Sequence, residues 1–75
     1  MSQKLPRVTS SQVIKALEKL GFSFSRQSGS HKIYKNAQGK RVTVPSHKGK
    51  VLHPKVLKSI LKDAELSSDE FRGFL

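Results

Sequence analysis

Residues 22–45 read FSFSRQSGSHKIYKNAQGKRVTVP, and this stretch decides the fold. Hydrophobic and polar residues alternate at its start and again at its end, as in strands that bury one face. Two turn sequences, SGS and NAQG, divide the stretch into three strands. Because short connections join consecutive strands, an antiparallel meander is favoured. We expect the last strand to end at Pro45, which cannot donate a hydrogen bond to a sheet.

Helical patterns precede and follow this predicted sheet in the sequence. Thr9 opens a capping-box sequence, and hydrophobic residues then recur at helical intervals, which predicts a helix over residues 10–20. Pro54 suits the first position of a second helix, with hydrophobic residues on one face and lysines on another. Ser67 repeats the capping pattern before a last short helical turn, which is expected to pack through Phe71, Phe74 and Leu75.

The predicted fold class is therefore α+β, in the order helix, strand, strand, strand, helix, with a short C-terminal helix. At 75 residues the chain suits one domain, 1–75, with a thin core. We expect both long helices to cover the same face of the sheet and to leave the other face open. The residues expected beneath the helices are Phe22, Phe24, Val42 and Val44.

The charge is strongly positive and unevenly distributed. Fifteen Lys and Arg residues oppose five Asp and Glu residues, for a net charge of +10, and no acidic residue stands between Glu18 and Asp63. Such a field is expected where a polyanion or an acidic protein neutralises it, and nucleic acid is the leading candidate. Charge that serves only solubility is the alternative.

Several residue types are missing or too sparse for common kinds of site. The chain has no cysteine, and its three histidines lack neighbouring carboxylates, so we expect no metal site. A domain of this size leaves little room for a large organic cofactor, and none is expected. No long hydrophobic run is present, which argues against a membrane span or signal peptide and favours a cytoplasmic location.

His31 directly follows the small residues Gly29 and Ser30, at the start of the second predicted strand. An imidazole can both take and give a proton near neutral pH, as RNA cleavage by the neighbouring 2′-hydroxyl requires. Nearby cations can stabilise the charge on the phosphate without a metal. A lone surface histidine is more often only a polar residue, so these features alone leave a catalytic and a passive role open.

Other residues carry the same ambiguity. His53 either caps the second helix, binds phosphate or supplies a second proton, and His47 is solvated or takes one of the latter two roles. Tyr34 either stacks on a base or packs in the core. The lysines of the second helix either contact phosphates or form a solvated face; they are Lys55, Lys58 and Lys62.

The sequence resembles the HicA toxins of bacterial and archaeal toxin–antitoxin pairs, from Pro6 to Phe71. The most specific matches are GF at 21–22, GSH at 29–31, VP at 44–45 followed by His47, and ILK at 60–62. The resemblance implies a fold similar to double-stranded RNA-binding domains and a ribonuclease that cleaves messenger RNA. It also implies arrest of translation and growth until a HicB antitoxin binds, and it places the family's catalytic histidine at His31.

Two positions depart from the family pattern. The second helix opens with the sequence HPKV at 53–56, where the family often has a small or hydroxyl residue, and Glu65 stands where glycine is frequent. Neither departure touches the GSH motif.

The resulting hypothesis is a metal-independent endoribonuclease toxin with His31 as general base or acid, neutralised by a tight, acidic HicB-type antitoxin. A non-catalytic RNA-binding module and an inactive member that only forms a complex are the alternatives. The candidate RNA-binding residues are Gly29, Ser30, Arg26, Lys32 and Lys50.

Overall fold

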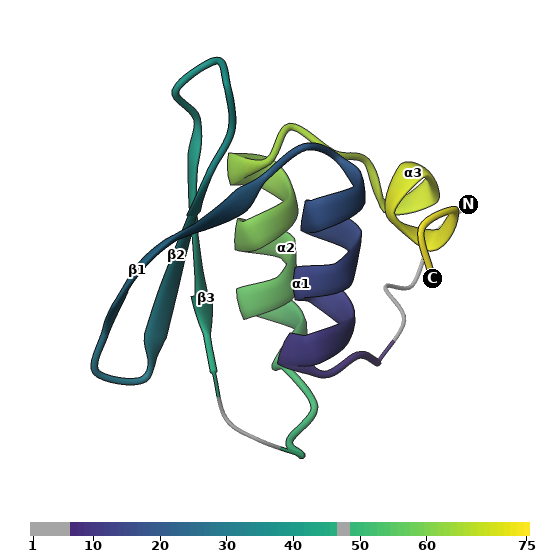
Figure 1. Ribbon diagram of the computed structural model, residues 1–75. Helices are drawn as coiled ribbons and strands as arrows, with labels where there is room; N and C mark the ends of the chain where they lie inside the picture. Colours follow the sequence, from purple (N-terminus) through teal and green to yellow (C-terminus); the bar gives the residue numbers. More distant parts are fainter. Residues whose placement is uncertain (1–6, 47–48) are drawn as a thin grey trace.

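Two long helices pack side by side against one face of an antiparallel three-stranded sheet (Figure 1). The computed structural model describes residues 7–46 and 49–75. The α+β prediction is confirmed, as is the layout of a double-stranded RNA-binding domain that the resemblance implies. The elements are α1 (Ser10–Lys19), β1 (Ser23–Ser28), β2 (His31–Lys35), β3 (Arg41–Pro45), α2 (Pro54–Asp63) and α3 (Ser68–Arg72).

The predicted helix starts are confirmed by their caps. The Thr9 hydroxyl accepts from the Gln12 backbone N–H, and the Gln12 side chain accepts from the Thr9 N–H at 2.9 Å, which completes a capping box. At α2, Nδ1 of His53 accepts from the Lys55 N–H at 3.1 Å, with Pro54 in the first helical position. The structure therefore gives His53 the capping role.

Both long helices end in the same hydrogen-bonding pattern. After α1, the Phe22 N–H donates to the Leu17 carbonyl at 2.9 Å across Gly21, whose φ of 101° is left-handed. After α2, the Leu66 N–H donates to the Leu61 carbonyl at 2.9 Å. Phe22 and Leu66 are both buried, so each helix end is closed by a hydrophobic residue.

The sheet register sorts the strand side chains onto two faces, because successive residues of a strand point to opposite sides. The face under the helices carries two rows across the strands, Phe24–Tyr34–Val42 and Gln27–Lys32–Val44. The open face carries three rows, Ser28–His31–Pro45, Arg26–Ile33–Thr43 and Ser23–Lys35–Arg41. A bulge between Phe24 and Arg26 adds one residue to β1, so that Phe24 lies on the helix side of the sheet and Arg26 lies on the open face.

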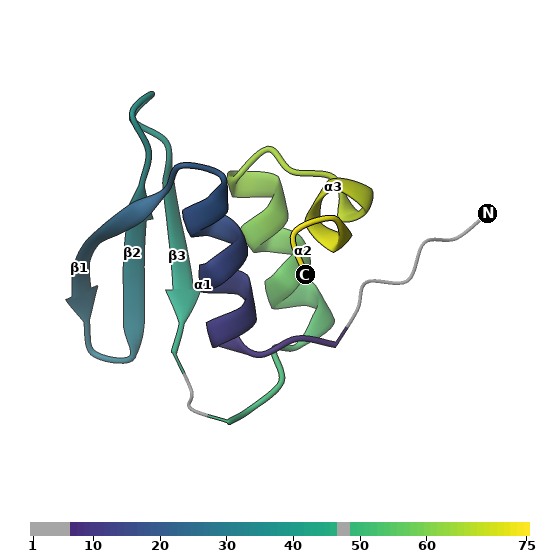
Figure 2. The same cartoon turned by 45° about the vertical axis from the view of Figure 1, so that its right-hand side comes forward.

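The core lies between the helices and the sheet, where β3 contributes Val42 and Val44 and β2 contributes Tyr34. Val42 and Val44 are 0% exposed, as predicted, whereas Phe24 is 52% exposed, so the prediction that it is buried was wrong. The reason is that β1 is the edge strand farthest from the helices, and all of its residues are exposed (Figure 2). Leu75 was also wrongly predicted to pack, since it is 54% exposed beyond the end of α3.

One end of the molecule brings together four segments that are distant in sequence. The β1–β2 turn, the end of β3 and the first turns of α1 and α2 all lie there, and we call it the His31 end (Figures 1 and 2). The opposite end carries the last turns of both helices. Within the described ranges, no helix is long and apolar enough to cross a membrane.

Candidate functional site

A tight hairpin turn presents the start of β2. Gly29 and Ser30 connect the paired residues Ser28 and His31, and the φ of 58° at Gly29 is what a type II′ turn needs at its first central position. The side-chain amide of Gln27 donates to the Gly29 carbonyl at 2.9 Å. The glycine of the GSH motif therefore has a conformational function, since it sets the position of His31.

Hydrogen bonds from two other elements fix this corner. The Ser46 N–H donates to the Ser30 carbonyl at 2.6 Å, just beyond the paired residues His31 and Pro45. The hydroxyl of Ser10, which is 5% exposed, donates to the Pro45 carbonyl at 2.6 Å. The first turn of α1 thus holds the end of β3, and β3 holds the start of β2. A side chain on such a support keeps a defined direction.

The His31 side chain lies exposed on the open face of the sheet. Ser28 and Pro45 flank it in its own row, and Arg26 occupies the diagonal position on β1, within reach of a long side chain. Among the described residues, none forms a hydrogen bond with the imidazole. The arrangement offers a free proton-transfer group beside a cation, on a surface that a polymer can cross.

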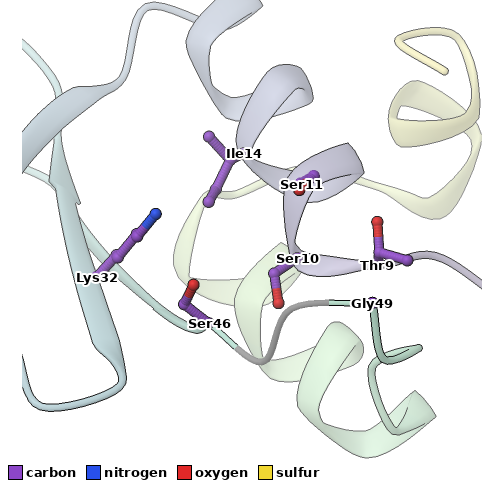
Figure 3. Close-up of a pocket in the computed structure, with 7 residues that line it drawn as sticks. All are labelled: Thr9, Ser10, Ser11, Ile14, Lys32, Ser46 and Gly49. Atoms are coloured by element: carbon purple, nitrogen blue, oxygen red, sulfur yellow. The ribbon is translucent and has the colours of Figure 1, made fainter.

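Lys32 lies on the other face of the sheet, although it follows His31 directly in sequence. It pairs with Val44 of the core and lines a cavity together with Ser10 and Ile14 of α1 (Figure 3). The structure therefore separates Lys32 from His31, whereas Arg26, the other predicted cation on these two strands, shares the open face with His31.

Lys50 lies at the His31 end, where it lines another, smaller cavity. This cavity of about 230 Å³ opens beside Pro45, which pairs with His31. His47 is outside the described residues. The lining residues are Pro45, Lys50, Val51, Leu52, His53 and Val56.

The acidic residues all lie away from the His31 end. Glu18 is in the last turn of α1, and Asp63 and Glu65 stand at the end of α2 and just beyond it. The remaining two, Asp69 and Glu70, belong to α3, on the side of the helices away from the sheet (Figure 2). At the His31 end, by contrast, the N-termini of two helices add their positive dipole ends to the lysines and arginines.

The structure also identifies residues that the sequence prediction missed. Ser10 and Ser46 hold the corner around His31, yet the sequence marked Ser10 only as the first helical residue and gave Ser46 no role. No local signal announces a bond between residues 10 and 45. Tyr34 was left open between base stacking and core packing, and its 4% exposure places it in the core.

A comparison with protein families matches residues 10–66 to the HicA toxin of bacterial toxin–antitoxin systems. The chain belongs to the HicA toxins. The matched range includes α1, the whole sheet and α2, so it contains the entire His31 end. A comparison with curated proteins gave no match.

The two departures from the HicA pattern leave this site intact. His53 still caps α2, and Glu65 adopts the left-handed conformation usual for glycine, with a φ of 57°. The Glu65 carboxylate forms an ion pair with Lys40 on the β2–β3 connection. His53 thus keeps the helix cap through a side-chain hydrogen bond, and Glu65 gains an ion pair although its backbone conformation is unfavourable.

Proposed function

We propose that this HicA toxin is a metal-independent endoribonuclease that cleaves messenger RNA, with His31 as its catalytic proton-transfer residue. The observation that carries the proposal is the exposed, unengaged imidazole at the end of the molecule that contains no carboxylate. A polyanion is attracted to that end, where His31 and Arg26 share one face.

The proposed reaction uses the RNA's own 2′-hydroxyl. The His31 imidazole takes the proton from this hydroxyl, the 2′-oxygen forms a bond to phosphorus, and the bond to the 5′-oxygen breaks. A second donor returns a proton to the leaving 5′-oxygen, which leaves a 2′,3′-cyclic phosphate and a 5′-hydroxyl. Arg26 stabilises the additional negative charge of the transition state from the neighbouring row.

The HicB-type antitoxin acts, in this proposal, by covering the open face. Its surface must be acidic to complement Arg26, Lys35 and Arg41, which line this face without any acidic neighbour in their rows. The same contact makes His31 inaccessible to RNA.

The experiment compares wild-type protein with His31→Ala on a labelled messenger RNA in EDTA, after thermal unfolding confirms that both are folded. We expect the substitution to slow cleavage by at least about a hundredfold, as for loss of a general acid–base group, while RNA binding is retained. His53→Asn is the matched control, since asparagine keeps the helix cap but removes an imidazole at the same end.

Equal cleavage by wild type and His31→Ala would contradict the proposal, as would loss of cleavage in His53→Asn alone. Binding without cleavage by any of the proteins would favour a non-catalytic RNA-binding module.

A further inference from the structure

A cavity of about 400 Å³ opens between α1 and the sheet, on the face opposite to His31. Its volume is in the range of roughly 300–1,000 Å³ that small-molecule sites occupy. Among the residues that the structure describes, one cation and several hydroxyl groups line it, without a carboxylate (Figure 3). The lining residues are Thr9, Ser10, Ser11, Ile14, Lys32, Ser46 and Gly49.

The Lys32 side chain points from β2 toward α1 in this cavity (Figure 3). It is half-buried, and its row neighbours Gln27 and Val44 carry no charge. It forms no ion pair with any described residue, and the acidic residues lie elsewhere on the molecule. A partly desolvated ammonium group without a counter-charge favours the entry of an anion.

Two hydroxyl groups in the cavity are also free to donate. The hydroxyls of Thr9 and Ser10 are engaged in the capping box and with the Pro45 carbonyl. In contrast, those of Ser11 and Ser46 form no hydrogen bond to another described residue. Together with Lys32 they provide a set of donors suited to phosphate oxygens, while Ile14 offers an apolar contact for a ribose.

We propose that this cavity, the Lys32 pocket, binds an RNA phosphate near the one cut at His31, together with its nucleotide. The inference rests on the proposed ribonuclease function for the identity of the ligand. At this end of the sheet, the two-residue turn of Gly29 and Ser30 comes directly before the adjacent residues His31 and Lys32, which lie on opposite faces. An RNA strand that bends around this turn reaches both faces. Lys32 is thereby a binding residue, and it does not contact the scissile phosphate.

Two substitutions test the pocket in opposite ways. Lys32→Gln removes the cation. Ser11→Asp places a carboxylate in the wall of the cavity that Lys32 also lines, and in the first turn of α1, which has no acidic residue, so it is expected to stabilise the helix. A loss of RNA binding by a protein that is at least as stable as wild type cannot be attributed to misfolding.

Matched controls make the same charge changes elsewhere. Lys19→Gln removes a cation from the last turn of α1, at the end of the molecule opposite to His31, and Ser68→Asp alters the first position of α3. In the His31→Ala background, affinity for a labelled single-stranded oligoribonucleotide should fall by about tenfold or more in the two pocket variants, because a charge-assisted bond is lost. The controls should stay within about twofold, since distant charges are screened.

A second measurement follows the backbone amide signals of Ser11, Lys32 and Ser46 in NMR spectra. We expect the oligoribonucleotide to shift these signals, and adenosine monophosphate or inorganic phosphate to compete only weakly. The proposal is overturned if all four variants weaken binding equally, if none does, or if only the free phosphates shift these signals. Because the readout is binding, a failure of His31-dependent cleavage is seen separately and leaves this result interpretable.

Discussion

At the scale of single residues, Tyr34 reports on the core. It is the only tyrosine in the chain and is 4% exposed, with the ring of Phe24 edge-on at 5.8 Å between centroids. Burial raises the pKa of its phenol above the ordinary value of 10.0, and the nearby Glu18 carboxylate raises it further. The neutral phenol is therefore the form that suits the folded state.

This shift predicts a loss of stability in alkali. Because the folded pKa lies above the unfolded one, the contribution of Tyr34 is complete below pH 10.0 and declines as the pH rises through the folded value. Tyrosinate absorbance should therefore appear above pH 10.0, together with falling unfolding free energy. Tyr34→Phe should show neither the tyrosinate absorbance nor this contribution to the fall in unfolding free energy. A Tyr34 that ionises at or below pH 10.0 in the folded protein would refute the assignment.

At the same scale, His31 and Lys32 differ in their position on the sheet. The sequence prediction grouped them because they are adjacent and because both suit RNA. The register places them on opposite faces. The strand periodicity already contained this information, since adjacent residues of a strand point to opposite faces. What the sequence could not reveal was the cavity that α1 forms over Lys32.

At the scale of elements, alternation predicted the strands but not which strand the helices cover. Phe24 has the alternation of a core residue, yet β1 is the edge strand farthest from α1 and α2 (Figure 2). Coverage depends on where the helices cross the sheet, which is a tertiary property. The helix starts were predictable because capping is encoded within a few residues, at Thr9, His53 and Ser67.

The end of α2 yields a testable prediction about Glu65. Its φ of 57° is unfavourable for a residue with a Cβ atom, and its ion pair with Lys40 is exposed. Glu65→Gly and Glu65→Ala both remove the ion pair, but only glycine removes the strain. In urea unfolding, Glu65→Gly should be more stable than Glu65→Ala by about 1 kcal/mol. Equal stabilities would show that the left-handed position stores no strain.

At the scale of the whole molecule, the two ends differ in charge and in dipole. Both long helices begin at the His31 end, and the acidic residues lie in their last turns, beyond them or on α3. Composition predicted a basic protein and a polyanionic partner. Only the fold shows that the acidic residues all lie away from the His31 end, where three of the four segments come from the acid-free stretch between Glu18 and Asp63.

The central claim is that the two faces of the His31 end have different roles, with RNA cleavage at His31 and RNA binding at Lys32. The most direct test is the single-turnover rate of RNA cleavage as a function of protein concentration. Lys32→Gln should need a higher protein concentration to reach half of its maximum rate, but this maximum rate should be close to that of wild type. His31→Ala should bind RNA at ordinary concentrations and remain slower by at least about a hundredfold at saturation. If the maximum rate of Lys32→Gln falls as far as that of His31→Ala, the two residues act on the same step and the separation of roles is wrong.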